Sequence, residues 1–369
     1  MKAEPIGLYV HIPFCVKKCD YCDFCSFAYS DIFWREAYIE RLCTEISEYK
    51  GREIAVNSIF FGGGTPSLLT ASEFKKITDA IKDSFSLSDD LEFTVEANPK
   101  TLTEQNLLSY IECGVNRVSI GLQTIHDNEL KSLGRIHNFA DFLDSYNLVR
   151  RLGISDINVD LMYGIPEQTR ESFVKSLEQV LALSPEHISV YGLILEEGTP
   201  LCENRDNLVF PDEDEECDMY YLASDKLSQA GYCHYEISNY AKPGYECRHN
   251  LKYWHSQEYI GFGVSSHSYY GGKRFANSDN ISEYLDEKNE KYILEDADAE
   301  YEYVMLRLRL SEGFSLRDYS LRFGYDFLEG RKDMINKLCE IGYVKIENGR
   351  ISLTDKGFYV SNSILCELI

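Results

Sequence analysis

The chain carries, between residues 9 and 22, the stretch Tyr9-Val-His-Ile-Pro-Phe-Cys15-Val-Lys-Lys-Cys19-Asp-Tyr-Cys22. A short apolar segment leads into three cysteines within eight residues. Three thiolates at this spacing can all reach one iron–sulfur cube, and because a cube has four irons, one iron remains open to an outside molecule. C-x3-C-x2-C is not a zinc spacing, since zinc sites use two separated pairs or mixtures of Cys and His. The stretch therefore predicts a [4Fe-4S] cluster on Cys15, Cys19 and Cys22. Cys25 either closes the fourth corner or points elsewhere.

Short β-rich segments recur about every thirty residues, with helix-patterned segments between them. Several are nearly continuous apolar strings, which is typical of parallel strands buried on both faces. Helical spacing occurs in Trp34–Tyr49 and Ser72–Phe85. This order predicts an α/β fold with right-handed crossovers, an incomplete parallel (β/α)6 barrel. The predicted strands are Leu8–Ile12, Ser58–Phe61, Leu91–Glu96, Arg117–Leu122, Ile157–Leu161 and Ile188–Leu193.

Polar and glycine residues follow these strands at the ends where barrel enzymes carry out their chemistry. Glycines let backbone N–H groups approach a ligand closely, and a carboxylate can accept both hydroxyls of a ribose. Together with the cysteines, these residues predict one site at the mouth of the barrel. In strand order they are Gly62-Gly63-Gly64-Thr65-Pro66, Glu96, Gln123, Asp160, and Tyr191 with Ile194, with Arg135 nearby.

The pattern changes after residue 200. Pro211-Asp-Glu-Asp-Glu-Glu predicts a helix start, because carboxylates favour the first turn. Residues 232–276 are rich in aromatic residues and glycine, and from about 297 the chain indicates three helices, a small hairpin and a last helix. We therefore expect a core barrel over residues 1–200, an extension over 201–296, and a mostly helical, winged-helix-like domain over 297–369.

Composition narrows the class of protein. The formal net charge of −24 argues against nucleic-acid binding, which requires basic residues to neutralise phosphates. No apolar stretch approaches the roughly 20 residues that span a bilayer, and the N-terminus does not resemble a signal peptide. Twelve cysteines in such a chain indicate reduced thiols with a metal site. We expect a cytoplasmic monomer or weak dimer.

The motifs in their order carry a family resemblance over essentially the whole chain. The chain resembles radical S-adenosylmethionine (SAM) proteins of the oxygen-independent coproporphyrinogen-oxidase group, and within that group it is most similar to the heme chaperones. The matching segments are 9–15, 61–67, 96–99, 114–123, 133–137, 160–164 and 235–240.

The resemblance implies a set of cofactor contacts. Cys15, Cys19 and Cys22 would hold the [4Fe-4S] cluster, and SAM would chelate its open iron. Electron transfer into SAM would generate a 5′-deoxyadenosyl radical, and the residues for reductive SAM cleavage are all present. The SAM pocket would contain Tyr9, Tyr21, Gly63, Gly64, Thr65, Glu96, Gln123, Arg135, Asp160 and Ile194.

Two functions from different classes follow from the resemblance. One is radical oxidative decarboxylation of coproporphyrinogen III. The other is a chaperone that binds heme and passes it to an acceptor protein, which is soluble or membrane-associated. The chaperone is favoured because Phe24 stands where the oxidases have a further cysteine. A third alternative is a radical SAM methyltransferase that degrades heme.

His249 is the heme-ligand candidate. It begins His249-Asn-Leu-Lys-Tyr253-Trp254, which matches the H-N-x-x-Y-W motif associated with heme binding in the chaperones. Neutral imidazole is a good axial ligand, and neighbouring aromatic rings can cover a porphyrin. From the residues alone, a hydrogen-bonding loop histidine is slightly favoured, and the match to the family motif reverses this order. Cys247 is a weaker candidate ligand.

Overall fold

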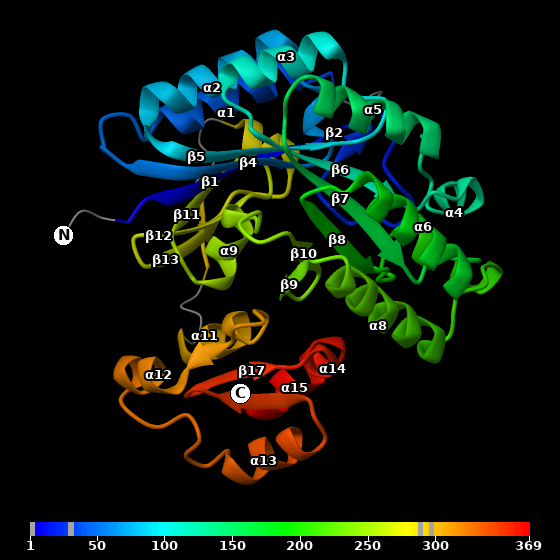
Figure 1. The fold of residues 1–369 in the computed structure, drawn as a ribbon. Coiled ribbons are helices and arrows are strands. Elements are labelled where there is room, and N and C mark those ends of the chain that lie inside the picture. Colours follow the sequence, from blue (N-terminus) through cyan, green and yellow to red (C-terminus); the bar gives the residue numbers. More distant parts are fainter. Residues whose placement is uncertain (1–3, 29–32, 287–290, 295–298) are drawn as a thin grey trace.

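The fold is built on a curved sheet of 12 strands within the described residues, in the order β14-β13-β12-β11-β1-β4-β5-β6-β7-β8-β10-β9 (Figure 1). The computed structural model describes residues 4–28, 33–286, 291–294 and 299–369. The parallel strands are β1 (Ile6–Ile12), β4 (Ala55–Gly63), β5 (Ser86–Ala97), β6 (Arg117–Gln123), β7 (Asp156–Tyr163), β8 (His187–Gly192) and β11 (Tyr259–Phe262). The antiparallel strands are β9 (Cys233–Glu236), β10 (Asn239–Ala241), β12 (His267–Tyr270), β13 (Lys273–Ala276) and β14 (Tyr292–Ile293).

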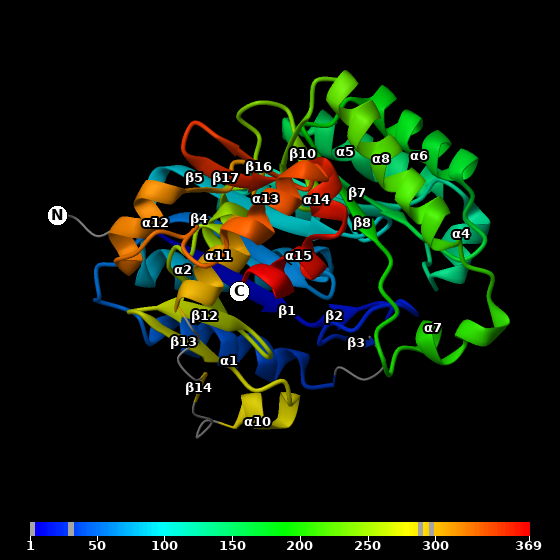
Figure 2. The same ribbon diagram turned by 90° about the horizontal axis from the view of Figure 1, so that it is seen from below.

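Most helices that connect the strands cover the outer face of this sheet, whereas α9 (Arg248–Trp254) lies on its inner side (Figures 1 and 2). Their starts follow the sequence: Thr70 and Glu73 form a capping box at α2, and Asp212 and Glu215 form one at α8. The acidic run after Pro211 is therefore a helix start, as predicted. The helices are α1 (Arg35–Ser47), α2 (Ala71–Ser84), α3 (Glu104–Cys113), α4 (Asp127–Ser132), α5 (Phe139–Arg151), α6 (Arg170–Leu183), α7 (Pro200–Glu203), α8 (Glu213–Gln229), α9 (Arg248–Trp254) and α10 (Ile281–Leu285).

The parallel strands differ on their two faces. In β6, Val118, Ile120 and Leu122 belong to the main hydrophobic core, whereas Arg117 and Ser119 face a central cavity. Both faces of β6 are buried, as expected, but the residues of its inner face are mostly polar, which the apolar pattern of the strands did not indicate. Side chains alternate along a strand, so one face can be apolar under the helices while the other is polar around a site.

The six predicted parallel strands all form, which confirms the incomplete barrel. One further parallel strand, β11, pairs with the outer edge of β1. Its four residues, Tyr-Ile-Gly-Phe, are too short a run to be recognised from the sequence. A small parallel pair, β2 (Phe14–Cys15) and β3 (Phe27–Ala28), brackets the cysteine loop.

The C-terminal residues form a mostly helical domain with its own hydrophobic core below the sheet (Figure 1). It docks on α8 and β9, where Asp355 accepts hydrogen bonds from Ser224 and His234 and the backbones of Ile237 and Arg309 are bonded. The boundary expected at 296–297 lies outside the described residues. The elements are α11 (Ala299–Arg307), β15 (Phe314–Ser315), α12 (Leu316–Phe323), α13 (Lys332–Glu340), β16 (Val344–Glu347), β17 (Arg350–Leu353), α14 (Asp355–Tyr359) and α15 (Ser361–Leu368).

Candidate functional site

A cavity of about 430 Å³ lies on the inner face of the parallel strands. Ligand pockets for molecules of cofactor size fall in this range of volume. Ile194 is not among the residues that line it, and its side chain is 68% exposed. The other site residues predicted from the sequence do line it: Tyr9, Cys15, Cys19, Tyr21, Cys22, Gly63, Gly64, Thr65, Glu96, Gln123, Arg135, Asp160 and His249.

The three cysteines reach the cavity from the loop that follows β1. The Thr65 hydroxyl donates to Cys15 Sγ at 3.6 Å, and Arg135 Nη1 donates to Cys19 Sγ at 3.5 Å. Burial raises the pKa of the Cys15 thiol, although the hydrogen bonds from Thr65 and Ser26 act in the opposite direction. Donors aimed at sulfur stabilise the thiolate form that a metal cluster requires.

The donor set fits a cluster better than a single ion. Among the described residues, no three Cys, His, Asp or Glu side chains gather closely enough to share one metal ion. A [4Fe-4S] cube binds each thiolate to a different iron and therefore holds its ligands farther apart. Arg135 Nε, which also borders the cavity, is buried without a hydrogen-bond partner.

Cys25 points away from the other three cysteines. Its thiol contacts the Asp279 carbonyl oxygen at 3.5 Å, and it is not a cavity-lining residue. Burial raises the pKa of this thiol to about 11, so it is protonated at neutral pH. Of the two alternatives that the sequence left open, the structure favours the one in which Cys25 points elsewhere.

Two carboxylates line the cavity, Glu96 near the end of β5 and Asp160 within β7. The Gly63 N–H donates to Glu96 at 3.2 Å, and Asn158 Nδ2 donates to Asp160 at 2.7 Å. Burial, followed by the charge of Asp160, raises the pKa of Glu96 to about 8. Burial also raises the pKa of Asp160. Two partly buried acids beside glycine backbone suit a ligand with hydroxyl donors and a positive charge.

Gly64 is fixed by the backbone of the cysteine segment. A Cβ on this residue would lie 2.8 Å from the Phe14 carbonyl oxygen and 2.9 Å from that of Ile12. Backbone atoms cannot rotate away, so we expect Gly64→Ala to lower the free energy of unfolding by about 1–3 kcal/mol. Urea denaturation measures this loss, and a variant as stable as the wild type would contradict the close packing.

His249 lies on α9, in the wall of the same cavity. It is 0% exposed, and its ring stacks on Phe60 with the centroids 5.3 Å apart. Nδ1 is 3.0 Å from the Ser58 hydroxyl, and Nε2 is 2.7 Å from the Tyr253 hydroxyl. Burial lowers the pKa of His249 to about 3, so the ring is neutral. A neutral imidazole fits an axial ligand of heme iron, and in this structure both of its nitrogens are hydrogen-bonded.

Sequence reasoning missed several polar residues of the cavity. The signal was the alternation within the strands, as in Arg117-Val-Ser119-Ile-Gly-Leu-Gln123, where every second residue lines the cavity. The same alternation runs through β7 and β8. The missed residues are the polar Asn98, Arg117, Ser119, Asn158, His187, Ser189 and Asn239 and the apolar Phe60 and Met162.

Residues 9–180 match the Radical SAM superfamily, and residues 294–360 match the HemN C-terminal domain. Coproporphyrinogen III oxidase (HemN) from Escherichia coli has the same fold, with a TM-score of 0.86 and 23% identity over 99% of this chain and 90% of that one. No described helix is both long and apolar enough to cross a membrane.

Curated relatives narrow the class of protein to one family. The heme chaperone HemW of Buchnera aphidicola subsp. Schizaphis graminum is 36% identical over 99% of this chain and 98% of its own. HemW of Escherichia coli (strain K12) is 41% identical over 72% of this chain and 71% of its own, and HemW of Bacillus subtilis (strain 168) is 34% identical over 96% and 97%. The chain belongs to the HemW family of radical SAM proteins. Radical SAM membership implies a [4Fe-4S] cluster and SAM.

Proposed function

We propose that this protein binds heme and transfers it to an acceptor protein. The observation that carries the proposal is the position of His249, neutral and buried in the cavity wall, in a chain that matches heme chaperones over nearly its whole length. In this proposal Cys15, Cys19 and Cys22 hold a [4Fe-4S] cluster, and SAM occupies the adjacent part of the cavity. Bound SAM supplies an electron-accepting sulfonium beside the cluster.

The residues around the SAM part of the cavity act by binding and orientation. Glu96 and Asp160 accept hydrogen bonds from ligand hydroxyl or amino groups, and Gly64 leaves room for backbone contact. Thr65 and Arg135 direct donors to the thiolates of Cys15 and Cys19. Ile194 belongs to this set by resemblance only, since it is exposed and does not line the cavity.

Heme ligation requires one change at His249. Ser58 orients the ring through Nδ1, as a hydrogen-bonded partner does for a metal-binding histidine. Nε2 must exchange its contact with the Tyr253 hydroxyl for the heme iron. In the heme-free protein the Tyr253 hydroxyl therefore occupies the ring nitrogen that would bind the heme iron.

This competition makes the test specific. Hemin is titrated into the reconstituted protein and the Soret band is recorded. His249→Ala is expected to abolish the histidine-ligated band. Tyr253→Phe is expected to tighten heme binding about fivefold, because one hydrogen bond of roughly 1 kcal/mol no longer competes. His267→Ala, on β12 and outside the cavity, is the matched control.

An unchanged Soret band in His249→Ala would contradict heme ligation by this residue. The same preparation, incubated anaerobically with SAM, a reductant and coproporphyrinogen III, tests the enzymatic alternative. Formation of protoporphyrinogen with 5′-deoxyadenosine would replace the chaperone proposal by oxidative decarboxylation.

A further inference from the structure

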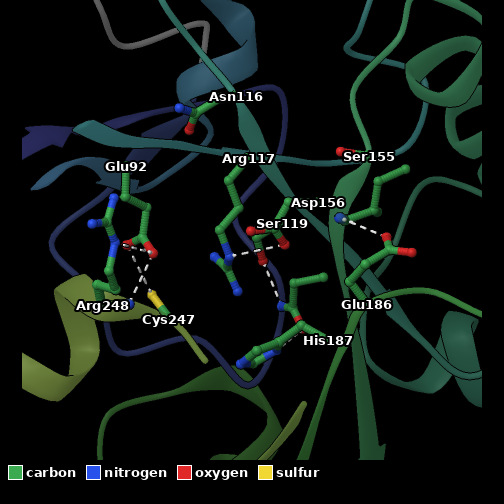
Figure 3. A network of polar contacts seen from close by, with 12 residues as sticks. Glu92, Asn116, Arg117, Ser119, Ser155, Asp156, Glu186, His187, Cys247 and Arg248 are labelled. Carbon is green, nitrogen blue, oxygen red and sulfur yellow. Dashed lines mark hydrogen bonds and ion pairs between the residues drawn. The ribbon is translucent and has the colours of Figure 1, made fainter. Parts of the chain in front are cut away.

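Arg117 is a buried cation whose guanidinium has no hydrogen-bond acceptor among the described residues. It begins β6, is 2% exposed and lines the inner part of the cavity. Its ion pair is with Asp156, made through Nε at 3.5 Å. Figure 3 shows its terminal nitrogens directed into the space between Cys247 and His187. A buried cation without acceptors is unusual, because each unpaired donor carries a desolvation penalty.

Neither of the acidic neighbours of Arg117, Glu92 and Asp156, accepts a hydrogen bond from its terminal nitrogens. Glu92 accepts the backbone N–H groups of Arg248 at 2.8 Å and His249 at 2.9 Å, so its charge is held by the start of α9. Burial raises the pKa of Asp156 to about 6, so it is still mostly ionised at neutral pH, but its carboxylate approaches Arg117 at Nε, at 3.5 Å, and not at the terminal nitrogens. The terminal nitrogens of Arg117 thus remain available.

Apart from Glu92 and Asp156, the groups beside Arg117 are polar and uncharged. His187 is neutral because burial lowers its pKa, and its two nitrogens are bonded to Asn158 Oδ1 at 2.6 Å and to the Tyr235 hydroxyl at 2.8 Å. Asn239 and Asn250 complete this end of the cavity. These groups can surround a small anion without supplying a second cation, so Arg117 would determine the sign of the ligand charge.

We propose that Arg117 forms a carboxylate-binding subsite at the inner end of the cavity. Two parallel N–H donors of a guanidinium match the two oxygens of a carboxylate, and the pairing is strongest where water is excluded. The carboxylate is either a free small acid or the propionate side chain of heme. The heme arm alone rests on the function proposed above.

The first experiment is calorimetric titration of the full-length reconstituted protein with sodium propionate at constant ionic strength, with chloride as the reference anion. Arg117→Gln is expected to weaken propionate binding at least tenfold. Asp156→Asn, which leaves Arg117 in place and removes its competing carboxylate, is expected to strengthen it. A gain of affinity cannot come from misfolding, so Asp156→Asn keeps the test decisive if Arg117→Gln is unstable.

The second experiment separates the two sources of carboxylate by comparing the binding of hemin with that of hemin dimethyl ester. Retention of the His249-dependent Soret band is the independent check on heme ligation. If the ester weakens binding to the wild type but not to Arg117→Gln, the subsite takes a heme propionate. If propionate binding depends on Arg117 and hemin binding does not, it takes a free acid. Propionate and hemin affinities that are both unchanged in Arg117→Gln and Asp156→Asn would overturn the subsite.

Discussion

Cys19→Ala will abolish the iron–sulfur absorbance of the reconstituted protein while its fold remains intact. Without Cys19 the protein supplies thiolates to only two irons of the cube instead of three. The Cys19 side chain lies in a loop and is only partly buried, and within the described residues its thiol is held by a hydrogen bond from Arg135. Its removal therefore affects the cluster far more than the packing. Iron and sulfide analysis with circular dichroism measures both effects.

Cys25→Ala provides the matched control, because Cys25 lies in the same segment but contacts the Asp279 carbonyl. We expect this variant to keep full iron and sulfide content. If Cys19→Ala kept its cluster, or if Cys25→Ala lost it, the assignment of the three ligands would have to be changed.

Glu96→Gln will stabilise the ligand-free protein at alkaline pH and weaken SAM binding. The pKa of Glu96 is about 8 in the folded protein against an ordinary value of 4.5. The folded state therefore binds this proton more tightly than the unfolded chain. The stabilisation is fully present below pH 4.5 and is lost as the pH rises towards 8, at up to about 1.4 kcal/mol per pH unit. Glutamine does not titrate and avoids the loss.

Urea denaturation of the wild type and Glu96→Gln between pH 5 and 9 measures this difference. The exposed Glu203→Gln on α7 is the control and should follow the wild type. SAM binding to the wild type should strengthen towards pH 8, because the ribose hydroxyls need the carboxylate as acceptor. Parallel stability curves for wild type and Glu96→Gln would exclude the raised pKa.

The sequence was sufficient to predict the core parallel strands and the set of residues around the cysteine loop. Strand ends of parallel sheets meet at one edge, so Gly64, Glu96, Gln123 and Asp160 could be assigned to one site before the structure was known. Ile194 follows the last of these strands after a short loop, and there the rule no longer fixes the direction of a side chain. Its 68% exposure shows that the strand-end rule does not extend into the loop that follows the strand.

Other features depend on contacts between distant segments and could not be read from local patterns. Edge strand β11 is four residues long and is fixed by pairing with β1. The partners of His249, Ser58 and Tyr253, come from a strand almost two hundred residues away and from the next turn of its own helix. The histidine motif alone did not reveal that both nitrogens are occupied.

The difference between the two faces of the parallel strands has a consequence for how this protein can change. Val118 and Ile120 pack under the helices and contribute to the free energy of folding, whereas Arg117 and Ser119 line the cavity and contribute little hydrophobic burial. A substitution at an inward position therefore alters ligand chemistry while removing little hydrophobic burial. Neighbouring residues of one strand can therefore change independently in evolution. The outward residues are under selection for stability, and the inward residues are under selection for ligand binding.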